Sequence, residues 1–331
     1  MGGDNGPAVI VPAALKALAY DTNLKIILVG PRDVLQAMLQ QHSAMDNPRI
    51  VLQEASQVVG MDEAPAVAMR TKRDSSMRVA INLVKEKKAH ACVSAGNTGA
   101  LMAIARFVLK MLPHIDRPAI ISCLPTLDKK VYVLDLGANV DCTANHLLQF
   151  AVMGATLVKN LEGISNPKVG LLNIGSEAIK GSEVIKQAAV LLGNKTNLNY
   201  IGFIEGDDIY KGLADVVVCD GFVGNVALKT SEGLARMIFS YAKQEFTASW
   251  YRKFIVLLAA PILKKLIKRF DPSQYNGASL LGLNGIVIKS HGNAGIEAFF
   301  SAICAAQKEV EKNVSALLQE QVVACFKEIT S

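Results

Sequence analysis

Short apolar runs alternate with amphipathic stretches along most of the chain. Several runs are continuously apolar and rich in Val, Ile and Leu, which is typical of strands buried on both faces of a parallel sheet. Helical spacing of apolar residues appears between some of them, for example at 33–41 and 75–88. Predicted strands lie at 24–30, 49–53, 90–94, 119–124, 131–137, 168–175, 198–204, 215–221 and 285–292. The alternation predicts an α/β fold with helices on both faces of a largely parallel sheet.

Five of these strands run directly into small, polar, glycine-containing loops. The loops read "VSAGNTG", "LDLGANVD", "LLNIGSEAIKG", "VVVCDGFVGN" and "VIKSHGNAG", and helical patterns follow at least four of them. Loops at the carboxyl ends of parallel strands gather at one edge of an open sheet, where they form a ligand crevice. Glycine permits close approach of the backbone, and helix N-termini attract anions. The pattern favours a shared anion site, with simple turns and helix caps as the alternative.

Composition and charge narrow the class of protein. The chain has 331 residues, of which 51% are hydrophobic and 19% charged, a globular composition. The formal charge of +6 fits an anionic substrate, an acidic protein partner or a membrane surface. It is too diffuse to indicate nucleic acid, and no zinc-finger or aromatic-basic RNA motif occurs. We therefore expect no nucleic-acid partner.

Cysteine and histidine usage gives no sign of a metal or disulfide site. The six cysteines lie far apart without a CxxC pair, so we expect small buried thiols in a reducing, cytoplasmic protein. The start, "MGGDNGPAVIVP", does not resemble a secretory leader. Walker, GxGxxG, HExxH and GxSxG motifs are all missing. Only one of the five histidines, His291, lies in a candidate site loop, where both a structural and a catalytic role stay open.

Several motifs in these regions resemble those of one family. In chain order they are "MGGDNGP", "SSMRVA", "SAGNTGALM", "DRPA", "LDLGANVDC", "VGLLNIGSEAIKG", "VVVCDGFVGNVALKT" and "YNGASLLGLNGIVIKSHG". They are similar to motifs of the bacterial phosphate acyltransferases, also called acyl-ACP:phosphate acyltransferases (the PlsX family). The match covers nearly the whole chain, and "SAGNTGA" and "DGFVGNVALK" are its most specific parts.

The resemblance implies a reaction and a setting. A long-chain acyl group would pass from acyl carrier protein to inorganic phosphate, and the acyl phosphate would serve phospholipid (phosphatidic acid) synthesis. The implied fold is a Rossmann-like three-layer α/β/α fold, like that of phosphotransacetylases and isopropylmalate dehydrogenases. The resemblance also implies a homodimer, no cofactor or metal, and peripheral association with the inner face of the cytoplasmic membrane. A membrane-bound glycerol-3-phosphate acyltransferase is the expected downstream partner.

The residues of the loops suit this reaction. Phosphate is itself the nucleophile, so no Ser or Cys need become acylated, and the protein must mainly hold an anion and stabilise an oxyanion. We predict catalytic roles for Lys180 and Asn225, although Lys180 could instead be an ordinary surface lysine. Phosphate and thioester positioning is predicted for Ser94, Gly96, Asn97, Thr98, Asn139 and Gly224, and supporting roles behind them for Asp4, Asp141, Glu177, Lys229 and His291.

A second informative stretch, "SWYRKFIVLLAAPILKKLIKRFDPSQYNG", lies near the end of the chain. Its uncharged part is too short to cross a bilayer, and after Pro261 it becomes amphipathic with a basic face. These features predict contact with an anionic membrane surface. The alternatives are a buried hairpin in a dimer interface and a basic face for acyl carrier protein. The predicted membrane residues are Phe254, Leu257, Leu258, Ile262, Leu263, Leu266 and Ile267.

The expected organisation is a single α/β domain over 1–331, with a helical insertion at 247–275. Family members carry a short strand of the type "IAxDA" before "MGGD", and this sequence begins at that motif, so we expect the strand to be missing. Three other functions stay open. They are a phosphotransacetylase that uses coenzyme A, a non-catalytic scaffold at the membrane and, least favoured, a dehydrogenase.

Overall fold

The computed structural model describes residues 1–249, 251–252, 256, 258–261, 263 and 272–330. Its strands are β1 Ile26–Gly30, β2 Ile50–Glu54, β3 Ala91–Ser94, β4 Ala119–Pro125, β5 Lys130–Leu134, β6 Lys168–Leu172, β7 Asn199–Ile204, β8 Val216–Val218, β9 Ala278–Leu281 and β10 Ile286–Lys289. The nine predicted strands are all confirmed. The sequence missed β9, which is only four residues long and has little periodicity to read.

Helices separate most of the strands. They are α1 Pro7–Tyr20, α2 Arg32–Gln41, α3 Pro65–Thr71, α4 Ser76–Lys85, α5 Thr98–Leu109, α6 Ala144–Glu162, α7 Glu183–Lys195, α8 Gly221–Thr247, α10 Ile296–Glu311 and α11 Val314–Thr330. Two short 3₁₀ helices, η1 Asp208–Lys211 and η2 Pro272–Tyr275, complete the described elements. The chain therefore has the α/β fold predicted from its sequence.

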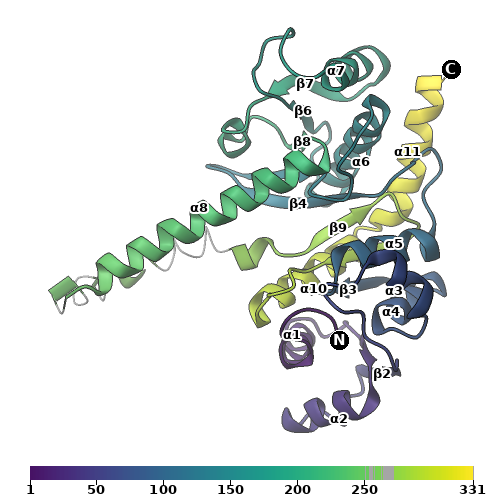
Figure 1. Ribbon diagram of the computed structural model, residues 1–331, viewed down its shortest axis with the longest axis vertical. Coiled ribbons are helices and arrows are strands. Elements are labelled where there is room, and N and C mark those ends of the chain that lie inside the picture. The colour runs from purple at the N-terminus through teal and green to yellow at the C-terminus, as the bar shows by residue number, and fades with distance from the viewer. Residues whose placement is uncertain (250, 253–255, 257, 262, 264–271, 331) are drawn as a thin grey trace.

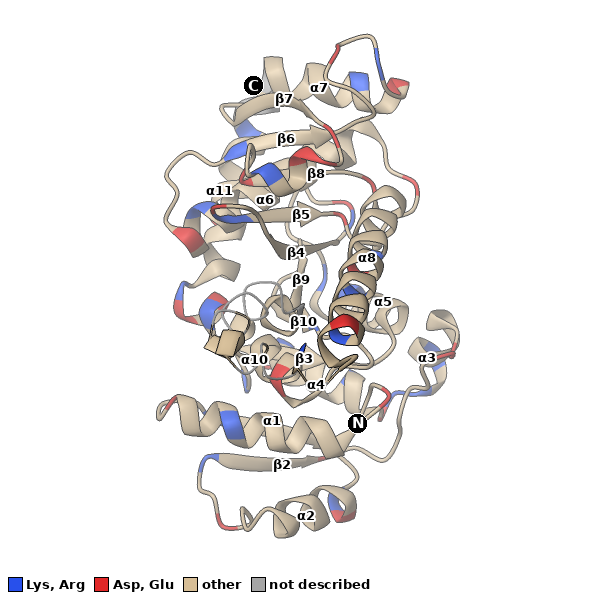
Figure 2. Ribbon diagram, turned by 90° about the vertical axis from the view of Figure 1, so that its left-hand side faces the viewer, with Lys and Arg blue, Asp and Glu red and all other residues tan. Residues whose placement is uncertain are grey.

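Eight strands form the main sheet, in the order β3-β10-β9-β4-β5-β8-β6-β7, which can be followed in Figure 2 from β3 near the bottom to β7 near the top. β1 and β2 form a separate parallel pair. Within the main sheet β10 is parallel to β3, and β8 is parallel to both β5 and β6, as β7 is to β6. The sheet is largely parallel, as predicted, but β9 and β4 interrupt it with antiparallel pairings.

These antiparallel strands correct one expectation. Passing from β10 through β9 and β4 to β5 reverses the direction three times, so β3 and β10 run opposite to β5, β8 and β6. The five loops consequently do not leave from one edge of the sheet. The register nevertheless brings two groups of strand ends together, because Ile288, Ser279, Ile121 and Leu134 lie in one row across the four strands. That row spans about 14 Å at the usual strand spacing, so β10 and β5 end close to each other.

Two hydrophobic cores lie on opposite faces of the sheet, as the alternation of side chains along a strand requires. Val216 and Val218 of β8 face a core built with α6, α7 and α11. Val217, between them, faces the other core, which includes α4 and α5. Helices thus cover both faces of the sheet, which gives the predicted three layers (Figure 1).

Helix α8 differs from the other helices in its length and position. It has 27 residues, which corresponds to about 40 Å. It begins against the middle of the sheet and extends away from the rest of the molecule (Figure 1). Exposed apolar side chains on it include Phe222, Val226, Met237, Ile238 and Tyr241. Its first turns can therefore shape a site on the sheet, while its outer part offers apolar surface.

About half of the predicted insertion at 247–275, including 264–271, lies outside the described residues. Of the predicted membrane residues, Phe254, Leu257, Ile262, Leu266 and Ile267 lie outside the described residues. Leu258 is described and is 69% exposed, while Leu263 is partly buried. Within the described part of the chain, no helix combines the length and apolar character needed to span a bilayer.

Candidate functional site

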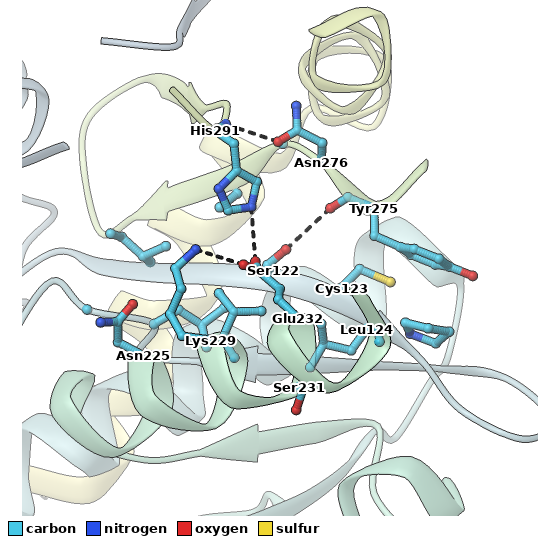
Figure 3. Close-up of a pocket in the computed structure, with 18 of the residues that line it drawn as sticks. Ser122, Cys123, Leu124, Asn225, Lys229, Ser231, Glu232, Tyr275, Asn276 and His291 are labelled. Carbon is cyan, nitrogen blue, oxygen red and sulfur yellow. Dashed lines mark hydrogen bonds and ion pairs between the residues drawn. The ribbon is translucent and has the colours of Figure 1, made fainter. Parts of the chain in front are cut away.

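A cavity of about 770 Å³ lies between α8 and the face of the sheet that carries α5. It draws on four of the five glycine-containing loops, through Thr98, Gly137, Asn225 and His291. Figure 3 shows the side chains at its polar end and part of its apolar wall. Segments that are far apart in the sequence therefore meet at one place, although they leave the sheet in opposite directions.

Two glycines allow α8 to start close to the loop that follows β5. A Cβ atom on Gly224 would lie 1.9 Å from the carbonyl oxygen of Asp135, and one on Gly221 would lie 2.7 Å from that of Asn139. No residue with a side chain fits at such distances. Asp220 caps the helix by accepting a hydrogen bond from the backbone N–H of Val223 at 2.9 Å. Gly224 is thus required for close backbone packing, and its predicted role in positioning phosphate or the thioester stays a prediction.

Asp135 holds the loop after β5 in shape. Its buried carboxylate accepts hydrogen bonds from the backbone N–H groups of Ile120, Ala138 and Asn139, at 2.9, 3.0 and 2.7 Å. The side-chain amide of Asn139 donates to the same carboxylate at 2.9 Å and to the Pro118 carbonyl at 2.7 Å. Burial raises the pKa of Asp135, against the opposing effect of these donors. Asn139, which the sequence predicts to contact substrate, is buried in this network and does not line the cavity.

The N-terminal residues pack on the loop after β3. A Cβ atom on Gly2 would lie 2.6 Å from Cα of Gly96, so the two backbones touch. Ser94 accepts a hydrogen bond from the Gly96 N–H at 3.2 Å. The backbone N–H of Asp4 donates to the carbonyl of Gly292 at 2.8 Å. The segment containing Asp4 thereby joins the loops after β3 and β10.

Asn97 and Thr98, which are neighbours in the sequence, have different surroundings. Asn97 caps α5 by accepting from the Ala100 N–H at 3.0 Å, and its amide donates to the carbonyls of Met61 and Glu63 at 2.6 and 3.0 Å. Its hydrogen-bonding groups are therefore used inside the protein. Thr98, the first residue of α5, lines the cavity. Of the two, Thr98 is the one placed to meet a ligand.

Three charged or titratable side chains form the polar corner of the cavity: Lys229, Glu232 and His291 (Figure 3). Glu232 accepts from Nζ of Lys229 at 2.9 Å and lies 3.3 Å from Nε2 of His291. The hydrogen bond from His291 is the main reason that the pKa of Glu232 falls to about 2, and Lys229 contributes as well. Lys229 was expected behind the site, but it lines the cavity because α8 runs along the cavity wall.

Asn276 fixes the backbone on which His291 sits. Its buried side chain accepts from the His291 N–H at 3.1 Å and donates to Ser290 Oγ at 2.8 Å and to the Ala298 carbonyl at 2.7 Å. These bonds connect the residue after η2 with the loop after β10 and with α10. The position of His291 is therefore set by a buried network.

Lys289, the last residue of β10, also lines the cavity, and the sequence did not single it out. It pairs in register with Ser94 of β3 and Ala278 of β9. Its ammonium group donates to the carbonyl of Ser290 and, at 3.5 Å, to that of Ala95. Burial is the main reason that the pKa of Lys289 falls to about 8, and the nearby charge of Lys229 contributes as well. The signal was present in "VIKSHG", but a lysine that ends a strand looks like an ordinary edge residue.

The remaining predicted residues lie away from the cavity lining. Lys180 is 45% exposed and forms an ion pair with Glu177 at 2.9 Å. The hydrogen bond that Lys180 donates to the Glu177 carboxylate raises the pKa of Lys180. Asp141 is exposed, and its backbone carbonyl accepts from Arg117 at 3.0 Å. Lys180 does not line the cavity, and its catalytic role stays a prediction.

The rest of the cavity wall is mainly apolar. It is formed by β4, by the middle of α8 and by η1 and η2, through residues that include Leu124, Pro125, Tyr210, Leu234, Ile238, Phe239 and Tyr275. This apolar arm leads away from the polar corner. Among the described residues, no group of three or more His, Cys, Asp or Glu side chains is placed to hold a metal ion. The site thus combines a charged end with a long apolar surface.

Comparison with known families gives a match over most of the chain. The model of a family described as "Fatty acid synthesis protein" matches residues 1–317. A phosphate acyltransferase of Nitrosococcus oceani is 58% identical over 323 residues, which is 96% of this chain and 95% of the relative. One from Coxiella burnetii is 56% identical over 330 residues, which is 99% of this chain and 96% of the relative.

Solved structures are similar at the level of the fold. A phosphotransacetylase from Streptococcus pyogenes has a TM-score of 0.63 and 19% identity, with 92% of both chains covered. The EutD phosphotransacetylase from Staphylococcus aureus has a TM-score of 0.61, with the same identity and coverage. These likenesses agree with the three-layer architecture.

Proposed function

Since the chain belongs to the fatty acid synthesis protein family of phosphate acyltransferases, we propose that it transfers a long-chain acyl group from acyl carrier protein to inorganic phosphate. The observation that carries this proposal is the shape and chemistry of the cavity. Its polar corner suits a small anion, and its apolar arm suits a hydrocarbon chain. The product, an acyl phosphate, would feed phospholipid synthesis.

The apolar arm supports a long acyl chain over an acetyl group. Leu234, Ile238 and Phe239 lie on α8 beyond Glu232, and Leu124 and Pro125 face them from β4. Each turn of the helix thus adds apolar surface beyond the charged end. An acetyl group would leave this surface unused, whereas a fatty chain would bury it, at roughly 25 cal/mol for each Å² removed from water.

The groups on the cavity wall favour direct attack by phosphate over an acylated enzyme. Burial raises the pKa of the Cys123 thiol to about 11, so its thiolate is scarce near neutral pH. The hydroxyl of Ser231 donates to the carbonyl of Ala227 at 2.8 Å, and Ser290 Oγ is held by Asn276. In the described part of the chain, none of Cys123, Ser231 and Ser290 has its thiol or hydroxyl bonded to an imidazole that could activate it, and Ser290 Oγ reaches His291 only at the backbone carbonyl.

In the proposed step, one phosphate oxygen attacks the carbonyl carbon of the thioester. A C–O bond forms, the C–S bond breaks, and the sulfur leaves with the carrier and takes up a proton. The dianion of phosphate needs little help from a general base, because the second proton of a phosphate monoester is lost near pH ~6. Asn225, at the polar end of the cavity, offers an amide donor for the oxyanion or for phosphate.

The test is a direct comparison of acyl donors. Purified protein is supplied with inorganic phosphate and either long-chain acyl-acyl carrier protein or acetyl-CoA, and acyl phosphate is measured. We expect formation from the acyl carrier protein substrate and little from acetyl-CoA. Faster reaction with acetyl-CoA would instead indicate a phosphotransacetylase. Loss of the thioester at a rate independent of phosphate would exclude the proposed reaction.

We further propose a homodimer, peripheral contact with the inner face of an anionic cytoplasmic membrane, and delivery to a membrane-bound glycerol-3-phosphate acyltransferase. The support is the family resemblance together with exposed apolar residues on α8, such as Met237 and Tyr241. Exposed apolar surface of this extent is typical of a partner or membrane contact. The basic residues of 252–269 would favour anionic lipid.

Membrane contact predicts a defined result in liposome flotation. Leu258→Glu and Leu263→Glu place a charge in the apolar segment, and both should reduce binding to anionic vesicles about tenfold or more. Val190→Glu, at an exposed position of α7, is the matched control and should bind like the unmodified protein. Undiminished binding of the two folded leucine variants would remove the membrane assignment.

A further inference from the structure

The surroundings of Lys289 are unusual for a lysine. Its side chain reaches the cavity from the end of β10, and it donates hydrogen bonds to the backbone carbonyls of Ala95 and Ser290. An ammonium group has three donors and no acceptor. Among the described residues, Lys289 forms no ion pair with a carboxylate, in contrast to Lys180, Lys186 and Lys229. A cationic group is thus held in a mainly apolar cavity without a counter-ion.

The charged side chains that the structure describes around Lys289 also leave its ammonium group without an ion pair. From α8, Lys229 repels it, and Glu232 is already engaged by Lys229 and His291. His291 lies two residues further along the loop of Lys289 itself. From the N-terminal segment, Asp4 is the one carboxylate with a resolved attraction to it, and that attraction is outweighed by burial. A small anion in the polar corner would therefore gain a charge-assisted hydrogen bond without breaking an ion pair of Lys289.

Building on the proposed function, we propose that Lys289 is the residue that binds inorganic phosphate, holding it between the polar corner and the apolar arm of the cavity. Thr98, at the start of α5, lines the cavity as well and adds a hydroxyl donor. Phosphate held there keeps an oxygen directed at the thioester, whose acyl chain occupies the apolar arm. Lys289 is then a substrate-binding residue and not the base or the nucleophile.

Phosphate binding by Lys289 has a proton signature. In the free protein the pKa of Lys289 is about 8, so near pH 8 about half of the side chain is uncharged. A bound dianion favours the charged form and raises this pKa. Near pH 8, where phosphate is already largely the dianion, binding is therefore accompanied by uptake of about half a proton.

The experiment is calorimetric titration of inorganic phosphate into the full chain near pH 8, in two buffers of different ionisation enthalpy. We expect proton uptake in the unmodified protein. Lys289→Met should weaken phosphate binding about 30-fold or more and abolish the uptake. Lys289→Arg, which stays protonated, should retain binding but show no uptake. Lys186→Met, on the surface of α7, should match the unmodified protein.

Kinetics separate this inference from the function on which it rests. Acyl phosphate formation by the unmodified protein tests the function, and the KM for phosphate in each variant tests Lys289. If the unmodified protein makes acyl phosphate while folded Lys289→Met keeps its KM for phosphate, the inference is overturned and the function stands. Should Lys289→Met fail to fold, the arginine variant decides. As the pH increases beyond 8, the KM for phosphate must rise in the unmodified protein and stay constant in Lys289→Arg. Equal pH profiles would refute the proposal.

Discussion

Lys289, which ends β10, and Lys180, in the loop between β6 and α7, both adjoin glycine-containing segments, but the two lysines have opposite surroundings. Lys289 lines a cavity, and burial lowers its pKa to about 8. Lys180 is 45% exposed, and its hydrogen bond with Glu177 raises its pKa. Sequence alone favoured Lys180, because "GSEAIKG" looks like an anion loop.

The difference shows that the sequence of a glycine-containing loop does not reveal whether its lysine is buried or already paired. A lysine that already has a carboxylate partner in water gains little by exchanging it for phosphate. A desolvated lysine without a partner gains a counter-ion when phosphate arrives, so its charge is available for binding. Burial and pairing, which depend on the whole fold, therefore matter more than the local sequence.

The largest contrast should come from two glycines, one in the first turn of α8 next to the cavity residue Asn225 and one in α7, the helix that follows Lys180. Gly224→Ala places a Cβ atom 1.9 Å from the Asp135 carbonyl oxygen and should lower the free energy of unfolding by about 3 kcal/mol or prevent folding. Gly193→Ala, in α7, meets no atom within 4 Å and should raise it by about 0.5 kcal/mol. Urea denaturation measures both. A stable Gly224→Ala protein would mean that α8 does not pack closely against the loop.

The next contrast compares the lysines directly. Lys289→Met should lower kcat/KM for phosphate by roughly 30- to 1000-fold, because it removes a buried charge that would pair with an anion. Lys180→Met should lower it by less than about threefold, since its charge is already paired in solvent. Initial rates at varied phosphate concentration give both numbers. The reverse ranking would return the catalytic assignment to Lys180.

The smallest contrast compares the contributions of Glu232 and Glu177, the carboxylates paired with Lys229 and Lys180, to stability at different pH values. The pKa of Glu232 is lowered to about 2, so its charge stabilises the folded state above about pH 4.5, and this contribution is lost as the pH falls toward 2. Glu232→Gln should be less stable than the unmodified protein by about 1 kcal/mol at pH 6, with the difference vanishing on acidification. Glu177→Gln should show no measurable difference at either pH. Urea denaturation at a series of pH values tests this, and a constant gap for Glu232→Gln would contradict it.

The sequence was sufficient for the class of fold and for most strands, because buried parallel strands leave a strong apolar signal. It was also sufficient to indicate that distant loops meet, as Thr98, Asn225 and His291 show by lining one cavity. It could not reveal that Asn97 and Asn139 use their amides inside the protein. Asparagine in a loop has the same pattern whether it caps a helix or meets a ligand.

The location of the site also depended on β9, which the sequence did not reveal. This short strand, with β4, reverses the direction of the sheet between β10 and β5. Because of this reversal, the loop after β10 leaves the sheet in the direction opposite to the loops after β5, β6 and β8, yet the register places the ends of β10 and β5 in one row. The long-range register of four strands, and not any local motif, therefore decides which loops meet.

The place of β10 in the sheet bears on how the protein is made. β3 is an edge strand whose one neighbour is β10, and the register joins Ala91 to Ile286, 195 positions later. During synthesis, β3 must wait for nearly the whole polypeptide to leave the ribosome before it finds its partner. Contacts this distant form slowly, and a nascent chain that stops before β10 exposes an unpaired strand and lacks the part of the cavity wall formed by Lys289, Ser290 and His291.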